Sequence, residues 1–319
     1  MKVVCIGEML IDFVCTDTNA GLVNGVNYVK KSGGAPANVA ACIGKLGADV
    51  SLVAAVGNDP YGQYLTEEIK AYHVNTDFVS TLPMSTTFAF VSLADNGERE
   101  FAFNRGADEQ LCLSDAAIEQ LTDDAIVHLG SATALLGGEL SASYSRLATA
   151  AKRKGNIICF DPNFRIGLWQ NREEEFKAKC EHYFALADIV KVSDDELVLL
   201  SNESDMQKGC QYFHDLGVKI VLVTLGPKGC LISHLGQQTL VPAYEITAID
   251  TTGAGDSFIG AVLFKMSKTA AGDHFYREQI ADFVAFAGKV SGLVCATIGA
   301  MAALPTLAEV EAGTFIVKK

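Results

Sequence analysis

The sequence predicts an α/β protein with a central, mostly parallel sheet, helices on both faces of that sheet, and a small separate β-sheet. Short apolar segments alternate with longer segments of helical periodicity over most of the 319 residues. This alternation is typical of a parallel sheet covered on both faces. Segments 13–33 and 86–106 break the alternation and have β character, which predicts the second, smaller sheet.

The composition is that of a globular protein with a sizeable core, large enough for one large α/β domain or two smaller ones. Hydrophobic residues make up 49% of the chain and charged residues 20%. The net charge of −13 argues against nucleic acid or an anionic membrane surface as the main partner. A ligand that carries phosphate remains compatible with this charge, because phosphate groups can meet local N–H groups and a metal ion.

The nine cysteines are scattered, and most lie in apolar surroundings. They predict buried free thiols in a reducing compartment, so we expect a cytoplasmic protein. Glu8 and Asp12 interrupt the N-terminal apolar run, which therefore does not resemble a signal peptide. Segment 290–308 carries no charge, but glycines and a proline interrupt it, so we expect a buried helix and a turn there.

The N-terminal third begins the main sheet and contains both segments of the small one. Pro36 suits the first position of a helix, and Gly47 suits its end. Asn-Gly dipeptides at 24–25 and 96–97 predict hairpins in the two β segments. The other elements predicted here are strands at 2–6 and 50–56 and a helix at 61–72.

The rest of the chain repeats a strand followed by a helix. Strands fit 125–129, 156–160, 189–192 and 220–224, and helices fit 139–154, 172–186, 194–201 and 205–216. A hairpin-like pair at 230–233 and 238–241 comes before an apolar helix that begins near Phe258. Helices near 274–295 and 306–312 complete the chain.

We expect residues 1–12, 34–85 and 107–319 to form the body and residues 13–33 and 86–106 to form the small sheet. That sheet is either an edge decoration or a lid over the carboxyl edge of the main sheet, where open α/β folds bind ligands. Its phenylalanines are expected to form one apolar face that the small sheet cannot bury alone: Phe88, Phe90, Phe101 and Phe103. This face predicts a homodimer through the lid.

Residues 250–258 are the most informative stretch. Gly253 and Gly255 allow a tight turn, and the small residues around Ala254 leave N–H groups uncovered at the start of a helix. Such a terminus favours an anion. Asp256 lies beside it, and a carboxylate next to a phosphate is explained if it accepts a proton from an attacking hydroxyl. The alternative is an ordinary glycine-rich turn in which Asp256 only complements the helix dipole.

Further polar residues follow the predicted strands. Asp12 can accept sugar hydroxyls, Asn38 can donate and accept, and Gly33-Gly34 lets a ligand approach the backbone. Arg165, in Asp161-Pro-Asn163-Phe-Arg165, suits a phosphate or a polarised oxygen. Each has an alternative: Asp12 and Asn38 as caps or turn residues, and Arg165 as half of a surface ion pair.

A second group lies after the later strands and suits a nucleotide: Ser193, Glu196, Thr224, Gly226 and Gly229. The turn at 226–229 can line the nucleotide, and Glu196 can hold Mg²⁺ through water. Alternatively, the turn has no ligand and Glu196 complements its own helix. The sequence contains neither a P-loop motif nor the protein-kinase H-R-D motif.

Together these segments resemble the PfkB family of ribokinase-like carbohydrate kinases over nearly the whole chain. Residues 33–38 look like its N-terminal signature and residues 250–258 like its C-terminal one. The resemblance implies a ribokinase-like fold, ATP and Mg²⁺, and phosphorylation of a sugar hydroxyl with Asp256 as base and 253–256 as anion hole. It also implies a monovalent-cation site, with K⁺ as the candidate, on Asp250, Thr252 and the backbone at Gly299.

The segments 103–108 and 161–169 look similar to fructokinases, and Ser193 stands where many family members carry asparagine. The resemblance therefore implies D-fructose as the substrate and O6 as the phosphorylated oxygen, with O1 not excluded. Arg105 is expected to reach a ring-side oxygen. The alternatives are a 2-keto-3-deoxygluconate kinase, a nucleoside kinase, and a sugar- or nucleotide-binding regulator without activity.

Overall fold

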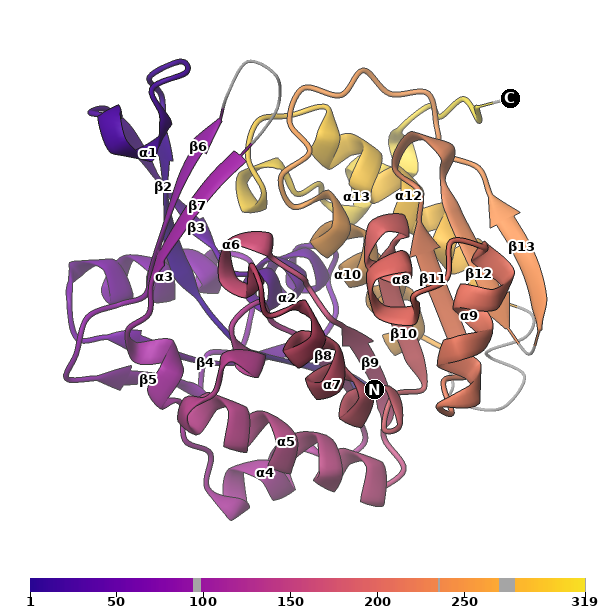
Figure 1. The fold of residues 1–319 in the computed structure, drawn as a ribbon, viewed down its shortest axis with the longest axis horizontal. Helices are drawn as coiled ribbons and strands as arrows, with labels where there is room; N and C mark the ends of the chain where they lie inside the picture. The colour runs from indigo at the N-terminus through magenta and orange to yellow at the C-terminus, as the bar shows by residue number, and fades with distance from the viewer. Residues whose placement is uncertain (94–98, 235, 270–278, 319) are drawn as a thin grey trace.

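The main sheet has nine strands in the computed structural model, which describes residues 1–93, 99–234, 236–269 and 279–318 (Figure 1). Their order is β13-β12-β11-β10-β9-β8-β1-β4-β5. The bounds are β1 (Lys2–Ile6), β4 (Val50–Gly57), β5 (Val79–Leu82), β8 (Ala125–Gly130), β9 (Ile157–Asp161), β10 (Ile189–Ser193), β11 (Ile220–Thr224), β12 (Cys230–His234) and β13 (Gln237–Val241). The strands from β5 to β11 pair in parallel, and β12 and β13 are antiparallel. The predicted mostly parallel sheet is confirmed.

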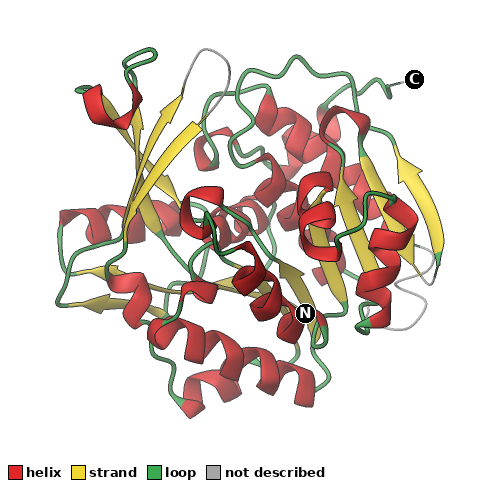
Figure 2. Ribbon diagram, viewed as in Figure 1, coloured by secondary structure: helices red, strands yellow, loops and turns green. Residues whose placement is uncertain are grey.

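Helices cover both faces of this sheet, as Figure 2 shows in red. One face carries α2 (Ala35–Lys45), α3 (Pro60–Ala71), α10 (Ala254–Ser267), α12 (Ile280–Cys295) and α13 (Leu307–Ala312). The other carries α4 (Asp115–Leu121), α5 (Gly138–Arg153), α7 (Glu173–Phe184), α8 (Asp194–Ser201) and α9 (Met206–Asp215). Two short helices, α1 (Gly21–Asn24) and α6 (Ile166–Trp169), lie outside these layers.

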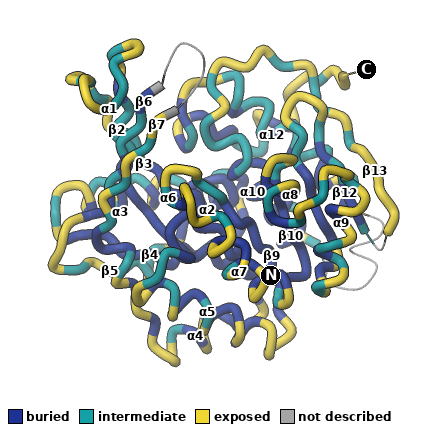
Figure 3. The backbone as a smooth tube through the Cα atoms, in the orientation of Figure 1, coloured by how far each residue is buried: buried dark blue, intermediate teal, exposed yellow. Residues whose placement is uncertain are grey.

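The side chains of each central strand alternate between two buried cores. In β1, Val3 and Cys5 join the core under α2 and α10, whereas Val4 and Ile6 join the core under α5 and α7. Each fully buried valine or isoleucine contributes roughly 1.5–3 kcal/mol of apolar burial, so both faces hold the sheet. Figure 3 shows the buried strands in dark blue beneath more exposed helices. This burial fixes the strand ends where polar residues emerge.

The small sheet has four strands in the order β3-β2-β6-β7 and stands off the body at the upper left of Figure 1. Its strands are β2 (Leu10–Cys15), β3 (Tyr28–Gly33), β6 (Phe88–Leu93) and β7 (Arg99–Asn104). The chain leaves β1 at Gly7 and re-enters β structure at Leu10. The small sheet therefore begins at Leu10, three positions before the expected start at residue 13, and Asp12 lies within its first strand.

The expectation of a single apolar face on this sheet is wrong. Cross-strand partners share a face, and Phe101 and Phe103 pair with Val91 and Ala89. Phe88 and Phe90 therefore point to the opposite face. That face is partly covered by the body, because Tyr61 of α3 meets Phe88 edge to face at a centroid distance of 5.1 Å.

The structure also bears on an edge strand, on the cysteines and on the uncharged segment near the C-terminus. Strand β5 was missed, because Val79, Ser80, Thr81 and Leu82 are only half-buried or exposed at a sheet edge and give no apolar run. All nine cysteines are free, and seven of them are buried. In the described ranges no helix is long and apolar enough to cross a membrane, and α12 ends at Cys295. The hairpin turn at 95–97 and residues 274–278 lie outside the described residues.

Candidate active site

The start of α10 presents free N–H groups, as residues 250–258 predict. Gly253 is the N-cap with a φ of 77°, in the left-handed region that favours glycine, and no side chain caps the helix. The Ala254 N–H donates to the Thr251 carbonyl at 3.2 Å. It is therefore not the free donor for an anion that we expected. Among the described residues, the N–H groups of Gly255 and Asp256 meet no acceptor. These two donors at a helix N-terminus fit a phosphate anion.

Asp256 is buried in the first turn of α10, with 8% of its surface exposed. The Asn38 side-chain amide, from the first turns of α2, donates to its carboxylate at 2.8 Å. Burial raises the pKa of Asp256, while Arg165, Asn38 and Lys191 act in the opposite direction. The Asn38 Oδ1 is buried and has no partner among the described residues, so it is available to a ligand hydroxyl.

Asp12 projects from β2 toward this pair. Burial raises the pKa of Asp12 to about 7, opposed by the charge of Arg165 and reinforced by Glu8 and Asp256. Gly33 faces it across the strand pair, and a Cβ there would collide with the Asp12 carboxylate. Gly34 has a φ of 106°, and a Cβ there would collide with the Glu8 carbonyl. The two glycines therefore make room for the side chains and backbone that line the site.

Glu8 is a site residue that the sequence reasoning missed. Its carboxylate is buried and accepts the Ala35 N–H at 2.9 Å and the Ser131 hydroxyl at 2.5 Å. It thereby fastens the start of α2 to the end of β8. Burial is the main reason that the pKa of Glu8 is raised. An acid directly after a buried strand was the available signal, since such a group needs partners.

The loop after β9 brings Arg165 over the site. Asn163 has a left-handed φ of 50° and is buried, and its Oδ1 accepts a hydrogen bond of 3.1 Å from Arg165. The guanidinium also donates to the Phe164 carbonyl at 3.0 Å, and within the described part of the chain it has no carboxylate partner. Its charge acts on both Asp12 and Asp256. The surface ion-pair alternative for Arg165 does not describe this geometry.

Asp161, at the end of β9, forms an ion pair of 2.9 Å with Lys191 of β10. Both side chains are almost completely buried, at 1% and 8% exposure. Lys191 was not assigned a role from the sequence, because a single lysine inside an apolar strand gives no distinctive pattern.

Arg105 follows β7 and is anchored within its own segment. Its Nε and Nη2 donate to Asp108 at 3.2 and 3.0 Å, and the Asp108 side chain is fully buried. Asp108 also accepts the Thr87 hydroxyl. The described contacts of Arg105 thus go to Asp108 and not to Asp12 or Asp256.

Ser193 and Thr224 lie side by side at the ends of β10 and β11. Ser193 and Glu196 form a capping box, in which the Glu196 carboxylate accepts the Ser193 N–H at 2.8 Å. The other Glu196 oxygen accepts the Phe164 N–H at 2.9 Å. Glu196 therefore joins the Arg165 loop to α8, and lone pairs remain for a metal-bound water.

The turn after β11 contains Gly226 and Gly229, both with left-handed φ values of 53° and 108°. A Cβ on Gly229 would collide with the Val241 carbonyl, whereas Gly226 has open space around it. The Leu225 N–H closes the turn on the Gly229 carbonyl at 2.8 Å. The turn is therefore compact and leaves the Gly226 backbone accessible.

Asp250 ties two distant segments together. One oxygen accepts the Thr252 N–H at 2.9 Å and its hydroxyl at 2.6 Å, and the other accepts the Gly299 N–H at 3.0 Å. Burial opposes the charge, but these hydrogen bonds outweigh it and lower the pKa of Asp250. The structure thus brings together the three residues of the expected monovalent-cation site.

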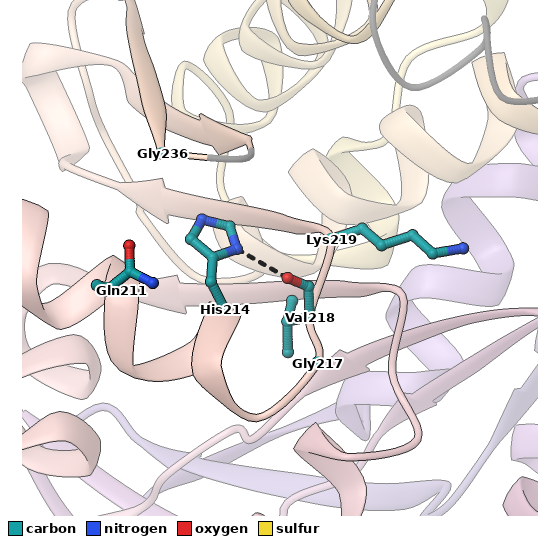
Figure 4. Close-up of a pocket in the computed structure, with 6 residues that line it drawn as sticks. All are labelled: Gln211, His214, Gly217, Val218, Lys219 and Gly236. Atoms are coloured by element: carbon teal, nitrogen blue, oxygen red, sulfur yellow. Dashed lines mark hydrogen bonds between the residues drawn. The ribbon is translucent and has the colours of Figure 1, made fainter.

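A surface pocket of about 400 Å³ lies far from these residues, at the amino-terminal edge of β11 (Figure 4). His214 lines it, with one ring nitrogen 2.7 Å from the Val218 carbonyl and the other 2.9 Å from the Ser233 hydroxyl. Both ring nitrogens of His214 therefore have hydrogen-bond partners within the protein. We assign this pocket no role.

The fold and the site define a small-molecule kinase of the α/β class, with a buried carboxylate beside a helix N-terminus that is open to phosphate. The pfkB family carbohydrate kinase model matches residues 1–307, and the chain belongs to this family of sugar kinases, with its ribokinase-like fold.

Known relatives and solved structures are similar along the whole chain. Probable fructokinase-4 of Arabidopsis thaliana is 34% identical over 316 residues, which cover 97% of this chain and 95% of the relative. A fructokinase with bound ATP from Xylella fastidiosa is 28% identical with a TM-score of 0.85, over 98% of this chain and 97% of that one. A fructokinase double mutant from Vibrio cholerae O395, in a form with fructose, ADP and potassium ion bound, is 29% identical with a TM-score of 0.84, over 98% and 97%.

Proposed function

We propose that the protein transfers the γ-phosphoryl group of ATP to a hydroxyl of D-fructose, giving fructose 6-phosphate. The observation that carries this proposal is the contact between Asn38 and the buried Asp256 beside two free helix N–H groups. Similarity to fructokinases, among them structures with ATP or with fructose and ADP bound, supports the choice of substrates.

In this reaction Asp256 takes the proton of the sugar O6 hydroxyl as the oxygen attacks the γ-phosphorus. The N–H groups of Gly255 and Asp256, at the turn formed by Gly253 and Ala254, hold the phosphoryl oxygens, and Arg165 offsets charge that develops there. Mg²⁺, held through water by Glu196, supplies further positive charge when it is bound. The sugar is held by Asp12, Asn38, Asn163 and the backbone at Gly33 and Gly34.

The nucleotide is assigned to the far side of the same edge. Ser193 and Thr224 lie at adjacent strand ends, and the backbones of Gly226 and Gly229 form the turn beyond them. Gly255 faces both substrates from the start of α10. In this proposal ATP lies along the carboxyl ends of parallel strands, where open α/β sheets bind nucleotides.

Arg105 bears on the identity of the sugar. A 2-keto-3-deoxygluconate kinase must bind a substrate carboxylate, whereas the guanidinium of Arg105 already carries the buried Asp108 as its counter-charge. A neutral ketohexose fits this arrangement better.

Coupled ADP production with ATP, Mg²⁺ and each of fructose, 2-keto-3-deoxygluconate, ribose and adenosine tests the proposal. Turnover on fructose alone is the expected result. Turnover on the keto acid would transfer the proposal to that substrate, and ATP binding without turnover on any acceptor would favour a regulator.

We further propose that Asp250, Thr252 and the Gly299 backbone hold K⁺, because Asp250 keeps unused lone pairs beside the anion site.

We also propose that the protein is located in the cytoplasm, because its cysteines are free and most of them are buried.

We propose that β2, β3, β6 and β7 act as a lid and also as the contact of a homodimer. The support is exposed apolar surface on the lid, where Val23 and Val26 are 92% and 80% exposed. Light scattering after size exclusion should give a dimer that Val23→Glu with Val26→Glu dissociates. Leu240→Glu, at an exposed site on β13, is the matched control. A monomer at all concentrations would exclude the dimer.

A further inference from the structure

We propose that Lys191 is a further catalytic residue, whose ammonium group binds the transferred phosphoryl group beside Gly255, and that Asp161 is the positioning residue that holds it there. This inference rests on the proposed kinase reaction. In that reaction the bond from the γ-phosphorus to its bridging oxygen breaks, and the bond to the sugar O6 forms. The proton of O6 goes to Asp256, and Lys191 remains an ammonium group throughout.

The first support is the position of Lys191. Its Nζ lies 2.9 Å from the Asp161 Oδ2, and 3.1 Å from the point where a Cβ on Gly255 would lie. Gly255 is the second residue of α10, and its N–H has no acceptor among the described residues. The ammonium group therefore lies against the same residue that offers a free N–H to the phosphate. A side chain at position 255 would press on the end of Lys191.

The second support is the sign of the charges. A helix N-terminus carries partial positive charge, so a buried cation next to it is electrostatically unfavourable. Asp161 compensates the charge of the ammonium group at a distance of 2.9 Å. An anion bound at Gly255 would be attracted by the helix terminus and by Lys191 at once. The ammonium group and the helix terminus repel each other in the free protein, and a bound phosphate would attract both of them.

The third support is the protonation state. Burial opposes the charge of Lys191, but Asp161 and Glu196 outweigh it and raise the pKa of Lys191. The group therefore stays charged at neutral pH. The charged and titratable groups that face Asp256 are Arg165, Lys191, Asp161, Asp12 and the Cys42 thiol. Of these, Lys191 and Arg165 are the two that favour the ionised base.

Lys191→Met is the direct test. We expect kcat to fall about 10²- to 10³-fold, as for loss of one preorganised transition-state donor. Calorimetry should show that binding of a non-hydrolysable ATP analogue weakens about 10- to 100-fold, while ADP binding changes little, since a charge-assisted contact to the terminal phosphate is lost. The acid limb of kcat/KM should move to higher pH, because Asp256 loses a neighbouring positive charge.

Lys177→Met is the matched control. Lys177 is also a buried lysine, 10% exposed by its side chain, but it pairs with Glu174 and Asn202 away from the site. Its loss should lower thermal stability without changing the preference for the ATP analogue over ADP or moving the pH profile. Lys191→Met combined with Asp161→Asn removes both buried charges and keeps the test valid if the single variant folds poorly.

Gly255→Ala provides a coupling test. A Cβ at 3.1 Å would press on the ammonium group and shift it from its position, so Gly255→Ala should lower kcat in the native background and have a much smaller effect in the Lys191→Met background. Equal effects in both backgrounds would overturn the proposal. So would an unchanged ATP-analogue preference in folded Lys191→Met. Absence of turnover by the native protein on every sugar would instead count against the proposed function.

Discussion

Asn38 and Asp256 lie 218 positions apart in the sequence and are joined by a hydrogen bond of 2.8 Å. The bond connects the first turns of α2 and α10, which pack against each other on one face of the main sheet. The two segments that carry the family signatures therefore form one site. The amide holds the carboxylate, and its own oxygen has no partner among the described residues, which in the proposed reaction leaves it for the sugar.

Replacing Asp256 with asparagine should lower kcat by about 10²- to 10⁴-fold, because the proton of the sugar hydroxyl loses its acceptor. The isosteric amide keeps the shape of the site, so thermal stability should change little. Steady-state ADP release and a melting curve measure the two effects.

Asp282→Asn is the control for this substitution, since Asp282 is also a first-turn acid but is exposed on α12. Turnover of Asp256→Asn at the native rate would exclude Asp256 as the base.

The KM for the sugar should rise as pH falls through about 7. Burial raises the pKa of Asp12 to about 7, so this carboxylate accepts sugar hydroxyls above that pH and is protonated below it. Asp12→Asn should raise KM at pH 8 and flatten its pH dependence.

Asp17→Asn is the control for this substitution, since Asp17 is an acid just after β2, the strand that contains Asp12. Hydrogen bonds from the Asn27 side chain and from the backbone of Val26 and Asn27 lower the pKa of Asp17. It should leave the KM profile unchanged. A native-like profile in Asp12→Asn would contradict the role of Asp12.

Gly34→Ala should abolish measurable sugar affinity and lower stability. The added Cβ meets the Glu8 carbonyl, and the φ of 106° is unfavourable for alanine. Isothermal titration with fructose and thermal melting measure both consequences.

Gly47→Ala separates the steric effect from the backbone effect. Gly47 has a similar φ of 93°, but a Cβ there meets nothing within 4 Å. Its substitution should cost only the backbone strain of about 1–3 kcal/mol and leave sugar binding intact. Equal losses of binding in both variants would show that strain alone is responsible.

Activity should be higher in K⁺ than in the same concentration of a tetramethylammonium salt. Asp250→Asn should remove the difference, because the substitution takes away the negative charge that favours a cation. Initial rates at matched ionic strength give the comparison. Asp282→Asn should keep the full response, and an undiminished response in Asp250→Asn would place the ion elsewhere.

The sequence predicts the parts of this molecule that depend on local pattern. The central strands of the main sheet are mostly apolar, and the segments 33–38 and 250–258 carry the turn chemistry of the site. The register of strand pairing does not depend on local pattern and cannot be predicted in this way. Phe88 and Phe101 look alike in the sequence, and only the pairing of β6 with β7 shows that they face opposite ways.

The partners of buried charges were also beyond sequence reasoning. Lys191 and Asp161 are 30 positions apart in the sequence. They meet because their strands, β10 and β9, are neighbours in the sheet. Glu8 binds Ala35 and Ser131, which no local pattern links to it. Asp108, three residues from Arg105, holds its guanidinium, and the sequence reasoning did not link this pair.

The strand order has a consequence for the protein as it is synthesised. From β8 to β13 each new strand is added to the edge of the sheet in the order of translation. The helices α10 and α12, which share one face with the earlier helices α2 and α3, come after all of them. At the usual speed of translation, their part of that face is bare for on the order of ten seconds. A nascent chain halted before Ala254 would carry a completed sheet with part of one apolar face open, and would be a substrate for chaperones.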